Sequence, residues 1–353
     1  MLMVNLFAGD MRMRKFIVLL LVVTLLLVAF SGCNEKDTDP GATNWQPNSA
    51  SDFKYTVDVK KSEIRINKYI GASKVVVIPA EIENMPVVAI EGIPTESDSD
   101  ILEGGFYKTD VVTVVIPETV RSIGLASFED CKELTQIVFK EDSNLRSIAY
   151  GAFSGCVKLE KIDFSTTKLI AIDMYAFSGC SNLNEIKFPE TLLKIGEGAF
   201  YECSSLVDVK LPPNLAEMGE NVFSYCISLE RINIPPNLRL NFFNGSAMHN
   251  VPALGQIVFD EGRKEIMGYA LIQTNGNVEV IVPKGVEKFS PLPFLFNPPS
   301  QKTISFLGDA PEIIEEDAPY WLEGTVVFYD PETSGWENFV WKDKVEMKQS
   351  QKN

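Results

Sequence analysis

The most regular feature of the sequence is an apolar pattern that recurs every 23 to 25 residues. It aligns on five cysteines, which lie 25, 24, 23 and 23 residues apart: Cys131, Cys156, Cys180, Cys203 and Cys226. Eleven, eight and three residues before each cysteine, and three, six and eight after it, the side chain is apolar. The position three before is always phenylalanine, at Phe128, Phe153, Phe177, Phe200 and Phe223. Such self-similarity at a fixed period indicates a repeat architecture.

The end of each repeat predicts a strand. Two inward apolar positions lie two residues apart, as in LNEIKF, and this alternation is typical of a strand. Pro189, Pro212 and Pro235 follow directly and end the strand, because proline cannot donate to a ladder. The AFxxC piece, with Phe and Cys three apart, fits one helical turn. One such unit cannot bury its own core, so we expect the repeats to stack into a solenoid with a parallel strand ladder on one face.

The motif LxxIxF-P, followed by an apolar pair and AFxxC, resembles the BspA-type bacterial leucine-rich repeat family. The resemblance implies a leucine-rich repeat solenoid that is β-rich with short helical turns. It implies an N-terminal cap and degenerate first repeat at 53–105, a repeat array at 106–262, and C-terminal degenerate repeats and cap at 263–353. We expect a hairpin in this last part, near Asn275 and Gly276. For function, the resemblance implies a cell-surface protein that adheres to host matrix proteins or to other cells.

The N-terminal segment MRMRKFIVLLLVVTLLLVAFSGC has a basic start and a 15-residue apolar run from Phe16 to Phe30. The run is shorter than a membrane-spanning helix needs, so residues 1–32 are predicted to be a secretion signal. The segment also resembles a bacterial lipoprotein signal, with Phe30 as the departure from its pattern. That resemblance implies that Cys33 is lipidated and that the polar stretch 33–52 tethers the protein to a membrane, on the outer surface of a bacterial cell. The alternative is cleavage elsewhere, which would leave Cys33 an ordinary thiol.

The outward strand positions indicate where a partner could bind. In the middle of the array their charges alternate, and we expect Lys161 to face Glu185, Asp163 to face Lys187 and Asp208 to face Arg231. Such a self-neutralised face disfavours a highly charged ligand. Towards the N-terminus the same face becomes apolar, and we hypothesise a contact patch for a protein partner there, formed by Val75, Val77, Val112, Val115 and Val138. The alternative is that a cap covers these valines.

The repeat cysteines and phenylalanines are predicted to be core residues. Equivalent cysteines in neighbouring coils would lie about 4.7–5 Å apart with parallel side chains, whereas a disulfide needs the side chains to face each other. Zinc would need ligands a few residues apart, and usually histidine. We therefore expect buried, unpaired thiols and neither a metal nor a cofactor.

Composition narrows the function further. The chain has 353 residues, 45% hydrophobic content and a net charge of -16, which disfavours binding to nucleic acid. The only histidine is His249, and no G-x-S-x-G, HExxH or phosphate-binding loop is present, so we expect no enzyme activity. Carboxylate pairs such as Glu315 with Glu316 are expected as surface decoration.

Other interpretations stay open at this point. A glycan-binding accessory protein of a surface uptake system could use Trp321, Trp336 and Trp341 as stacking platforms. The irregular segments 91–105 and 240–250 break the repeat pattern and are either further sites or loop padding. The sequence leaves the oligomeric state undetermined.

Overall fold

The computed structural model describes residues 45–94, 102–239, 247–267, 272–274, 277–290, 294–296, 302–314 and 324–350. The chain divides into two compact units, residues 1–46 and 47–353, and the repeat array lies in the second. The predicted signal segment 1–32 and Cys33 lie outside the described residues. In the described part, the helices are the 3-10 segments η1 (Ala50–Asp52) and η2 (Trp336–Asn338), and none could span a bilayer.

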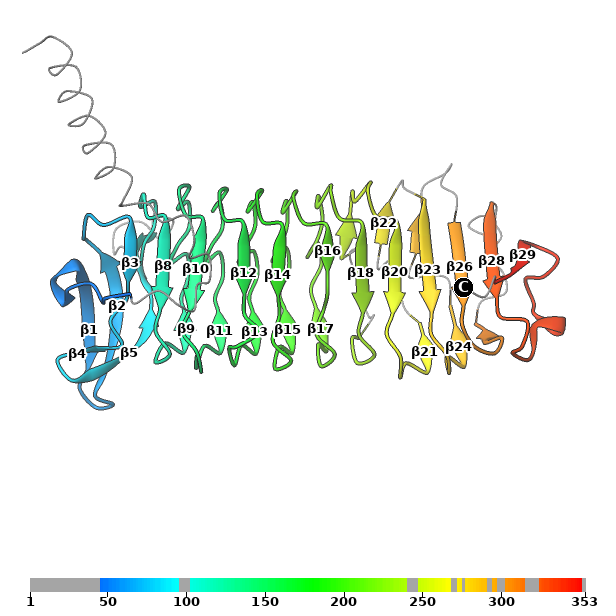
Figure 1. Cartoon of the computed structure of the whole chain (residues 1–353), viewed down its shortest axis with the longest axis horizontal. Coiled ribbons are helices and arrows are strands. Elements are labelled where there is room, and N and C mark those ends of the chain that lie inside the picture. The colour runs from blue at the N-terminus through cyan, green and yellow to red at the C-terminus, as the bar shows by residue number, and fades with distance from the viewer. Residues whose placement is uncertain are drawn as a thin grey trace, which may run out of the picture. The chain divides into compact units, whose positions relative to one another are not determined.

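Each coil contributes one strand, of two to five residues, to a parallel ladder, here called the front ladder (Figure 1). It is divided into two sheets. The first runs in the order β14 (Glu185–Lys187), β12 (Lys161–Asp163), β10 (Gln136–Phe139), β8 (Thr113–Ile116) and β3 (Val75–Val77). The second runs in the order β16 (Asp208–Val209), β18 (Arg231–Ile234), β20 (Gln256–Phe259), β23 (Val278–Val282), β26 (Lys302–Phe306), β28 (Thr325–Tyr329) and β29 (Glu346–Gln349). These are the strands that the repeat pattern predicts, so the leucine-rich repeat solenoid is confirmed.

A second ladder, here called the back ladder, was not predicted. Its strands hold the apolar position eight residues before each cysteine and are only two residues long: β9 (Ser122–Ile123), β11 (Ser147–Ile148), β13 (Ala171–Ile172), β15 (Lys194–Ile195) and β17 (Glu217–Met218). Equivalent residues pair in parallel, for example Ile148 with Ile172. A strand this short contains no alternation, which is why the sequence pattern does not reveal it.

The N-terminal end of the array is closed by antiparallel pairing. β1 (Phe53–Asp58) and β2 (Glu63–Tyr69) form a hairpin, and β2 joins the back ladder through β5 (Met85–Ile90). β4 (Glu81–Ile82) pairs with β5, and β6 (Gly92–Pro94) pairs with β7 (Leu102–Gly104). The segment 47–52, which the sequence assigned to the tether, belongs to the same compact unit as this hairpin.

The C-terminal part continues the parallel array, and the predicted hairpin near Asn275 and Gly276 is wrong. β22 (Ile272–Thr274) pairs in parallel with β19 (Met248–His249) and β25 (Phe294–Phe296). β23 pairs in parallel with β20 and β26 instead of folding back on β22. β22 and β23 are consecutive in the chain but pair within different sheets. A third set of short strands consists of β21 (Glu265–Ile266), β24 (Lys288–Phe289) and β27 (Glu312–Ile313).

The AFxxC segments are turns, so the prediction of a helical turn there is wrong. Cys156 N–H donates to the carbonyl of Phe153 at 3.2 Å, as in a 3-10 turn, but Phe153 N–H donates to Ala176 of the next coil at 2.7 Å. These bonds between coils alternate with the local ones. The residue before each cysteine also has positive φ, +72° at Gly155 and at Gly179, which a helix cannot accommodate. The glycine of the repeated SGC triplet therefore serves a left-handed turn.

The core is a column of stacked side chains inside the coils. Neighbouring phenylalanine rings lie 4.7–5.5 Å apart between centroids and within 3–9° of parallel, from Phe106 through Phe128, Phe153, Phe177 and Phe200 to Phe223. The phenylalanines three residues before the cysteines and the cysteines themselves are fully buried. The predicted core positions thus form one continuous column along the array.

Candidate functional site

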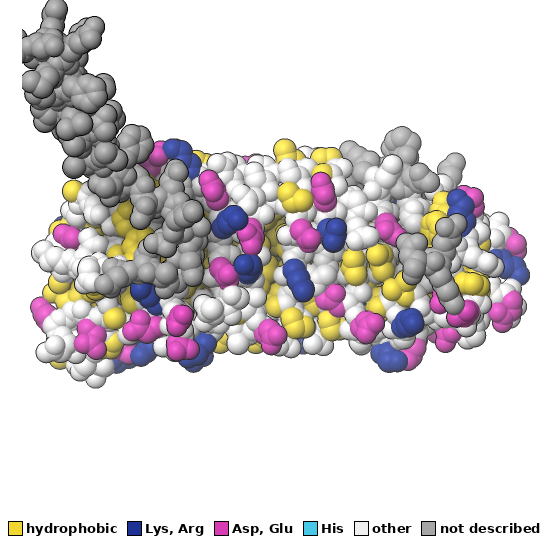
Figure 2. Space-filling view, in the orientation of Figure 1, with side chains coloured by type: hydrophobic (Ala, Val, Ile, Leu, Met, Phe, Trp, Pro, Cys, Tyr) yellow, Lys and Arg dark blue, Asp and Glu magenta, His cyan; other side chains and the backbone are white. Residues whose placement is uncertain are grey.

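The charged outward positions pair as the sequence predicts. Lys161 Nζ lies 3.0 Å from Glu185, Lys187 Nζ lies 3.4 Å from Asp163, and Arg231 lies 3.8 Å from Asp208. These side chains are exposed, and basic and acidic groups alternate over the middle of the face seen in Figure 2. Lys161 lowers the pKa of Glu185 by hydrogen bonding to it, and Asp163 raises the pKa of Lys187. We call this outward side of the front ladder the front face.

The five valines do not form one exposed patch. Val75 is 43% exposed, but Val77 and Val115 are 7% and 0% exposed, and Val112 and Val138 are half-buried. Part of the reason is Asn48, which lies along the edge of β3: Asn48 N–H donates to the carbonyl of Val77 at 2.9 Å, and Val77 N–H donates to Asn48 Oδ1 at 2.8 Å. This burial agrees with the alternative that other parts of the chain cover the valines. Of the five, only Val75 has an exposed side chain that a partner could contact.

The front face instead opens in the middle of the array, where the front ladder is interrupted. β14 and β16 belong to consecutive coils but to different sheets, while their coils stay joined in the back ladder through β15 and β17. The phenylalanine column is also continuous there, with Phe177 and Phe200 5.3 Å apart. The interruption is therefore confined to the strand pairing of the front ladder.

Proline removes one of the hydrogen bonds that would join the two coils here. In two coils the residue after the strand donates its N–H to the preceding coil, as Lys140 does to Ile116 and Asp260 does to Ile234, both at 3.0 Å. Pro212 occupies this position in the coil that follows Phe188 and has no N–H to give. Within the described chain, neither the backbone N–H nor the C=O of Phe188 forms a hydrogen bond.

The neighbouring coils have the same defect, but side chains repair it. Pro189 leaves the carbonyl of Phe164 without a ladder donor, and Thr167 supplies both its N–H at 2.9 Å and its hydroxyl at 2.8 Å. Pro235 likewise leaves the carbonyl of Leu211 without a ladder donor, and the side chain of Asn233 bonds to both backbone groups of Leu211 instead. Leu211 N–H donates to Asn233 Oδ1 at 2.6 Å, and Asn233 Nδ2 donates to the carbonyl of Leu211 at 3.0 Å. The interruption at Phe188 has no such replacement among the described residues.

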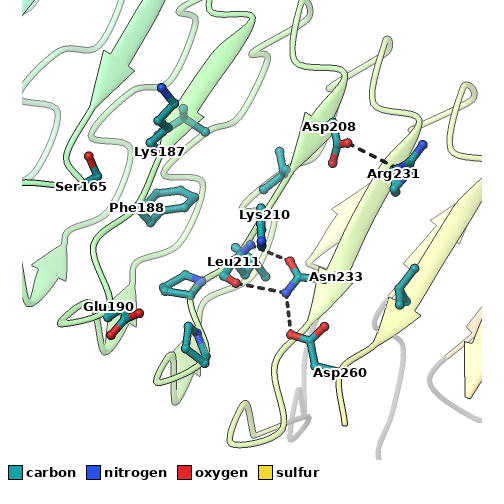
Figure 3. Close-up of a pocket in the computed structure, with 15 residues that line it drawn as sticks. Ser165, Lys187, Phe188, Glu190, Asp208, Lys210, Leu211, Arg231, Asn233 and Asp260 are labelled. Carbon is teal, nitrogen blue, oxygen red and sulfur yellow. Dashed lines mark hydrogen bonds and ion pairs between the residues drawn. The ribbon is translucent and has the colours of Figure 1, made fainter. Parts of the chain in front are cut away.

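A groove with a volume of about 830 Å³ lies at this interruption (Figure 3). Its floor includes Phe188, Leu211, Pro212 and Val258. Charged side chains surround the floor: Lys187, Glu190, Asp208, Lys210, Arg231 and Asp260. An apolar floor with a mixed polar rim is typical of a surface that binds another molecule.

One basic group in the groove differs from the others. Lys187 and Arg231 are held by carboxylates, whereas the exposed Lys210 forms no ion pair with any described residue. The charge of Lys210 acts on the carboxylate of Asp260, which also accepts a hydrogen bond from Asn233 at 2.6 Å. Burial raises the pKa of Asp260, and the Asn233 bond and the charge of Lys210 oppose that rise only in part. Lys210 thus leaves a cation available in the groove.

The repeat cysteines are free and buried, as predicted, and they also make hydrogen bonds. The thiol of Cys156 donates to the carbonyl of Phe128 at 3.0 Å, and that of Cys180 donates to Phe153 at 3.2 Å. Cys131, Cys203 and Cys226 do the same with the preceding coil. Burial raises the pKa of Cys180 to about 12, so these thiols are protonated and unreactive.

The other candidate residues are not assembled into a site. Among the described residues, no group of histidine, cysteine and acidic side chains could hold a metal. His249 lies in strand β19, half-buried with its ring 5.7 Å from Tyr225. Trp336 and Trp341 are buried in the C-terminal core, so they offer no stacking platform. Trp321, the Glu315 and Glu316 pair, and residues 95–101 and 240–246 of the irregular segments lie outside the described residues.

The groove itself was missed from the sequence. Pro212 was a visible signal, but we interpreted it only as the end of a strand, like Pro189 and Pro235. The three prolines leave the carbonyls of Phe164, Phe188 and Leu211 without a ladder donor. The sequence does not reveal which of these carbonyls accepts a hydrogen bond from a nearby side chain instead. That depends on the placement of Thr167 and Asn233, which only the structure provides.

Comparisons with known proteins agree with this architecture. A family described as the BspA type leucine rich repeat region matches residues 99–198 and 170–297, with six copies. A comparison with curated proteins gave no match.

Several solved structures are similar to the chain. A leucine rich repeat protein of T. pallidum is 26% identical, with a TM-score of 0.43 over 65% of this chain and 86% of that one. A leucine rich cell surface protein of Faecalibacterium prausnitzii is 16% identical, with a TM-score of 0.40 over 88% and 100%. The pneumococcal vaccine antigen PcpA is 17% identical, with a TM-score of 0.43 over 87% and 99%.

Proposed function

This chain belongs to the BspA-type bacterial leucine-rich repeat proteins, and from that premise we propose that it is an exported, lipid-anchored protein of the bacterial cell surface that binds extracellular proteins. Its partners are host matrix proteins or the surface proteins of other cells. The observation that carries this proposal is the groove in the front face, an apolar floor with a polar rim on an otherwise self-neutralised surface. Binding, and not catalysis, is what such a surface offers.

The net charge and the front face favour a protein partner. With a net charge of -16, the chain would repel phosphate backbones and anionic lipid surfaces. The front face pairs most of its own charges, so affinity has to come from apolar contact and a few polar bonds. Protein interfaces have this character, with an apolar centre and a hydrated rim. The proposal that glycans are the ligand has no tryptophan platform to support it in the described chain.

The protein-binding proposal is tested with immobilised host matrix extracts. We expect saturable binding of the exported form that disappears when the extract is treated with protease and persists after treatment with glycosidase. Loss of binding after glycosidase alone would favour the glycan-binding accessory instead. No saturable binding to any protein extract or to intact cells would contradict the proposal.

The anchor is tested by a single substitution in the full chain. Cys33→Ser removes the thiol to which a lipid would be attached, so we expect the protein to move from the membrane fraction to the soluble fraction. Cell fractionation followed by immunoblotting measures this distribution. The matched control is Cys156→Ser, which alters a buried repeat thiol and should leave the distribution unchanged. If Cys33→Ser stays with the membrane, Cys33 is not the anchor.

A further inference from the structure

We propose that the groove beside β14 and β16 binds an extended peptide segment of the partner, which hydrogen-bonds to the backbone of Phe188 at the end of β14 and places one acidic side chain beside Lys210. The inference rests on the proposed function and deepens it, because it names the part of the partner that is recognised. Three observations carry it: an unpaired backbone edge, an apolar floor and an unpaired cation.

The unpaired edge is at Phe188. One coil earlier, Phe164 N–H donates to the carbonyl of Lys187 at 2.9 Å, and one coil later both backbone groups of Leu211 bond to Asn233. In the described chain the N–H and C=O of Phe188 lack the equivalent bonds, although the residue is half-buried. Backbone groups in such positions are normally paired. An extended peptide can supply both a donor and an acceptor, as in the known cases of strand addition to a sheet edge.

The floor of the groove suits the side chains of such a peptide. Phe188 contacts the core through Phe200, with ring centroids 5.8 Å apart, and presents its remaining surface to the groove beside Pro212. Leu211 in the next coil and Val258 two coils after that one add apolar surface, and Asn233 lies in the coil between them. In an extended peptide alternate side chains point the same way, so one apolar residue can lie on the floor while the next points outward.

Lys210 determines the sign of the charge that the peptide carries. It is exposed and forms no ion pair with the described residues, whereas Lys161, Lys187 and Arg231 on the same face are already paired with acids. A single carboxylate of the peptide would complete the alternation of charges that the front face shows elsewhere. Glu190 and Asp208 on the rim would repel a longer acidic run. The expected occupant is therefore an extended segment with apolar side chains and one acid.

The test begins with a library of short random linear peptides panned against the exported protein. We expect selected peptides to contain apolar residues and one acid, and to bind Lys210→Glu about tenfold more weakly than the wild type. Lys284→Glu is the matched control, because it makes the same charge change at an exposed lysine outside the groove and should leave affinity unchanged. Both variants alter exposed side chains that form no ion pair in the described part of the chain, so both should fold.

Backbone pairing is tested on the peptide itself. N-methylation removes one backbone donor at a time, and we expect methylation at alternate residues to weaken binding about tenfold or more. Hydrogen exchange at the amide of Phe188 should slow when the peptide binds, while that of Phe164, already bonded, should change little.

Four results would overturn the proposal: panning that yields no binder, selected peptides that bind Lys210→Glu as tightly as the wild type, affinity that is insensitive to N-methylation at every position, or a dimer that Lys210→Glu dissociates. The last result would assign the groove to a second copy of the chain. Because the peptides are synthetic, this experiment can fail while binding to matrix proteins persists, and the two proposals are therefore distinguishable.

Discussion

At the scale of single residues, the repeat cysteine combines two properties. Each buried thiol packs as a small apolar group, and its S–H also donates to a backbone carbonyl of the preceding coil, at 2.8–3.2 Å. Each cysteine therefore links two coils. The sequence does not show this link, because in the repeat pattern cysteine counts only as a small hydrophobic residue. Burial also raises the pKa of each of these thiols above its usual value.

Removing one thiol should destabilise the array. Cys180→Ala leaves a small cavity and the carbonyl of Phe153 without this donor, and we expect a loss of about 1–3 kcal/mol in the free energy of unfolding. Urea denaturation measures the change. The control Thr166→Ala alters an exposed residue and should cost less than about 0.5 kcal/mol. Equal stability of Cys180→Ala and the wild type would show that the thiol bond contributes nothing.

The raised pKa of the buried thiols predicts a loss of stability at alkaline pH. The pKa of Cys180 is about 12 in the folded protein against 9.0 for an ordinary thiol, so the unfolded chain loses this proton first as the pH rises. Stability is therefore complete below about pH 9 and falls towards pH 12, by about 1.4 kcal/mol per pH unit for one such thiol. Denaturation at pH 7 and pH 10 measures the slope, and Cys180→Ala should have a shallower one. An identical slope would contradict this assignment.

At the scale of elements, the phenylalanine column and the charge pairs of the front face contribute very unequally to the stability of the fold. The phenylalanine column is buried and continuous from coil to coil, whereas the charge pairs of the front face lie in solvent. Exposed pairs are worth about 1 kcal/mol or less, but a large buried ring is worth several. The elements are thus held together from the inside of each coil, and the front face is left free for function.

Two substitutions should separate these contributions. Phe177→Ala removes a ring stacked between Phe153 and Phe200, and we expect a loss of about 3–5 kcal/mol. Lys161→Ala breaks only the exposed contact with Glu185, and we expect a loss below about 1 kcal/mol. Thermal and urea unfolding measure both. A larger loss for Lys161→Ala than for Phe177→Ala would reverse this assignment.

The sequence predicts the front strands and the core well, because their apolar positions repeat in register. It does not predict the back ladder, whose strands, such as Ile148 with its neighbour Ser147, are too short to show alternation. It also gives a helical turn at AFxxC, where the residues before Cys156 and Cys180 are left-handed. The burial of Val77 was missed for a third reason, since Asn48 lies beside it and no local pattern shows this long-range contact.

At the scale of the whole molecule, one repeated unit produces both rigidity and a site. The back ladder and the phenylalanine column run past β14 and β16 without a break, while the front ladder parts between them. The groove is therefore a local departure on a continuous scaffold, as expected where function resides in a repeat protein. What sets this coil apart is that the bond lost at Pro212 has no replacement among the described residues, unlike those lost at Pro189 and Pro235.

The central claim is that this groove is where the protein binds its partner, and site-specific photo-crosslinking tests it most directly. A photoreactive amino acid replaces Pro213, exposed in the groove, or Met174, exposed beyond β13 of the back ladder, and each variant is illuminated in matrix extract. We predict protease-sensitive adducts at position 213 and none at position 174. Adducts at position 174 alone, or equal adducts at both positions, would contradict the account.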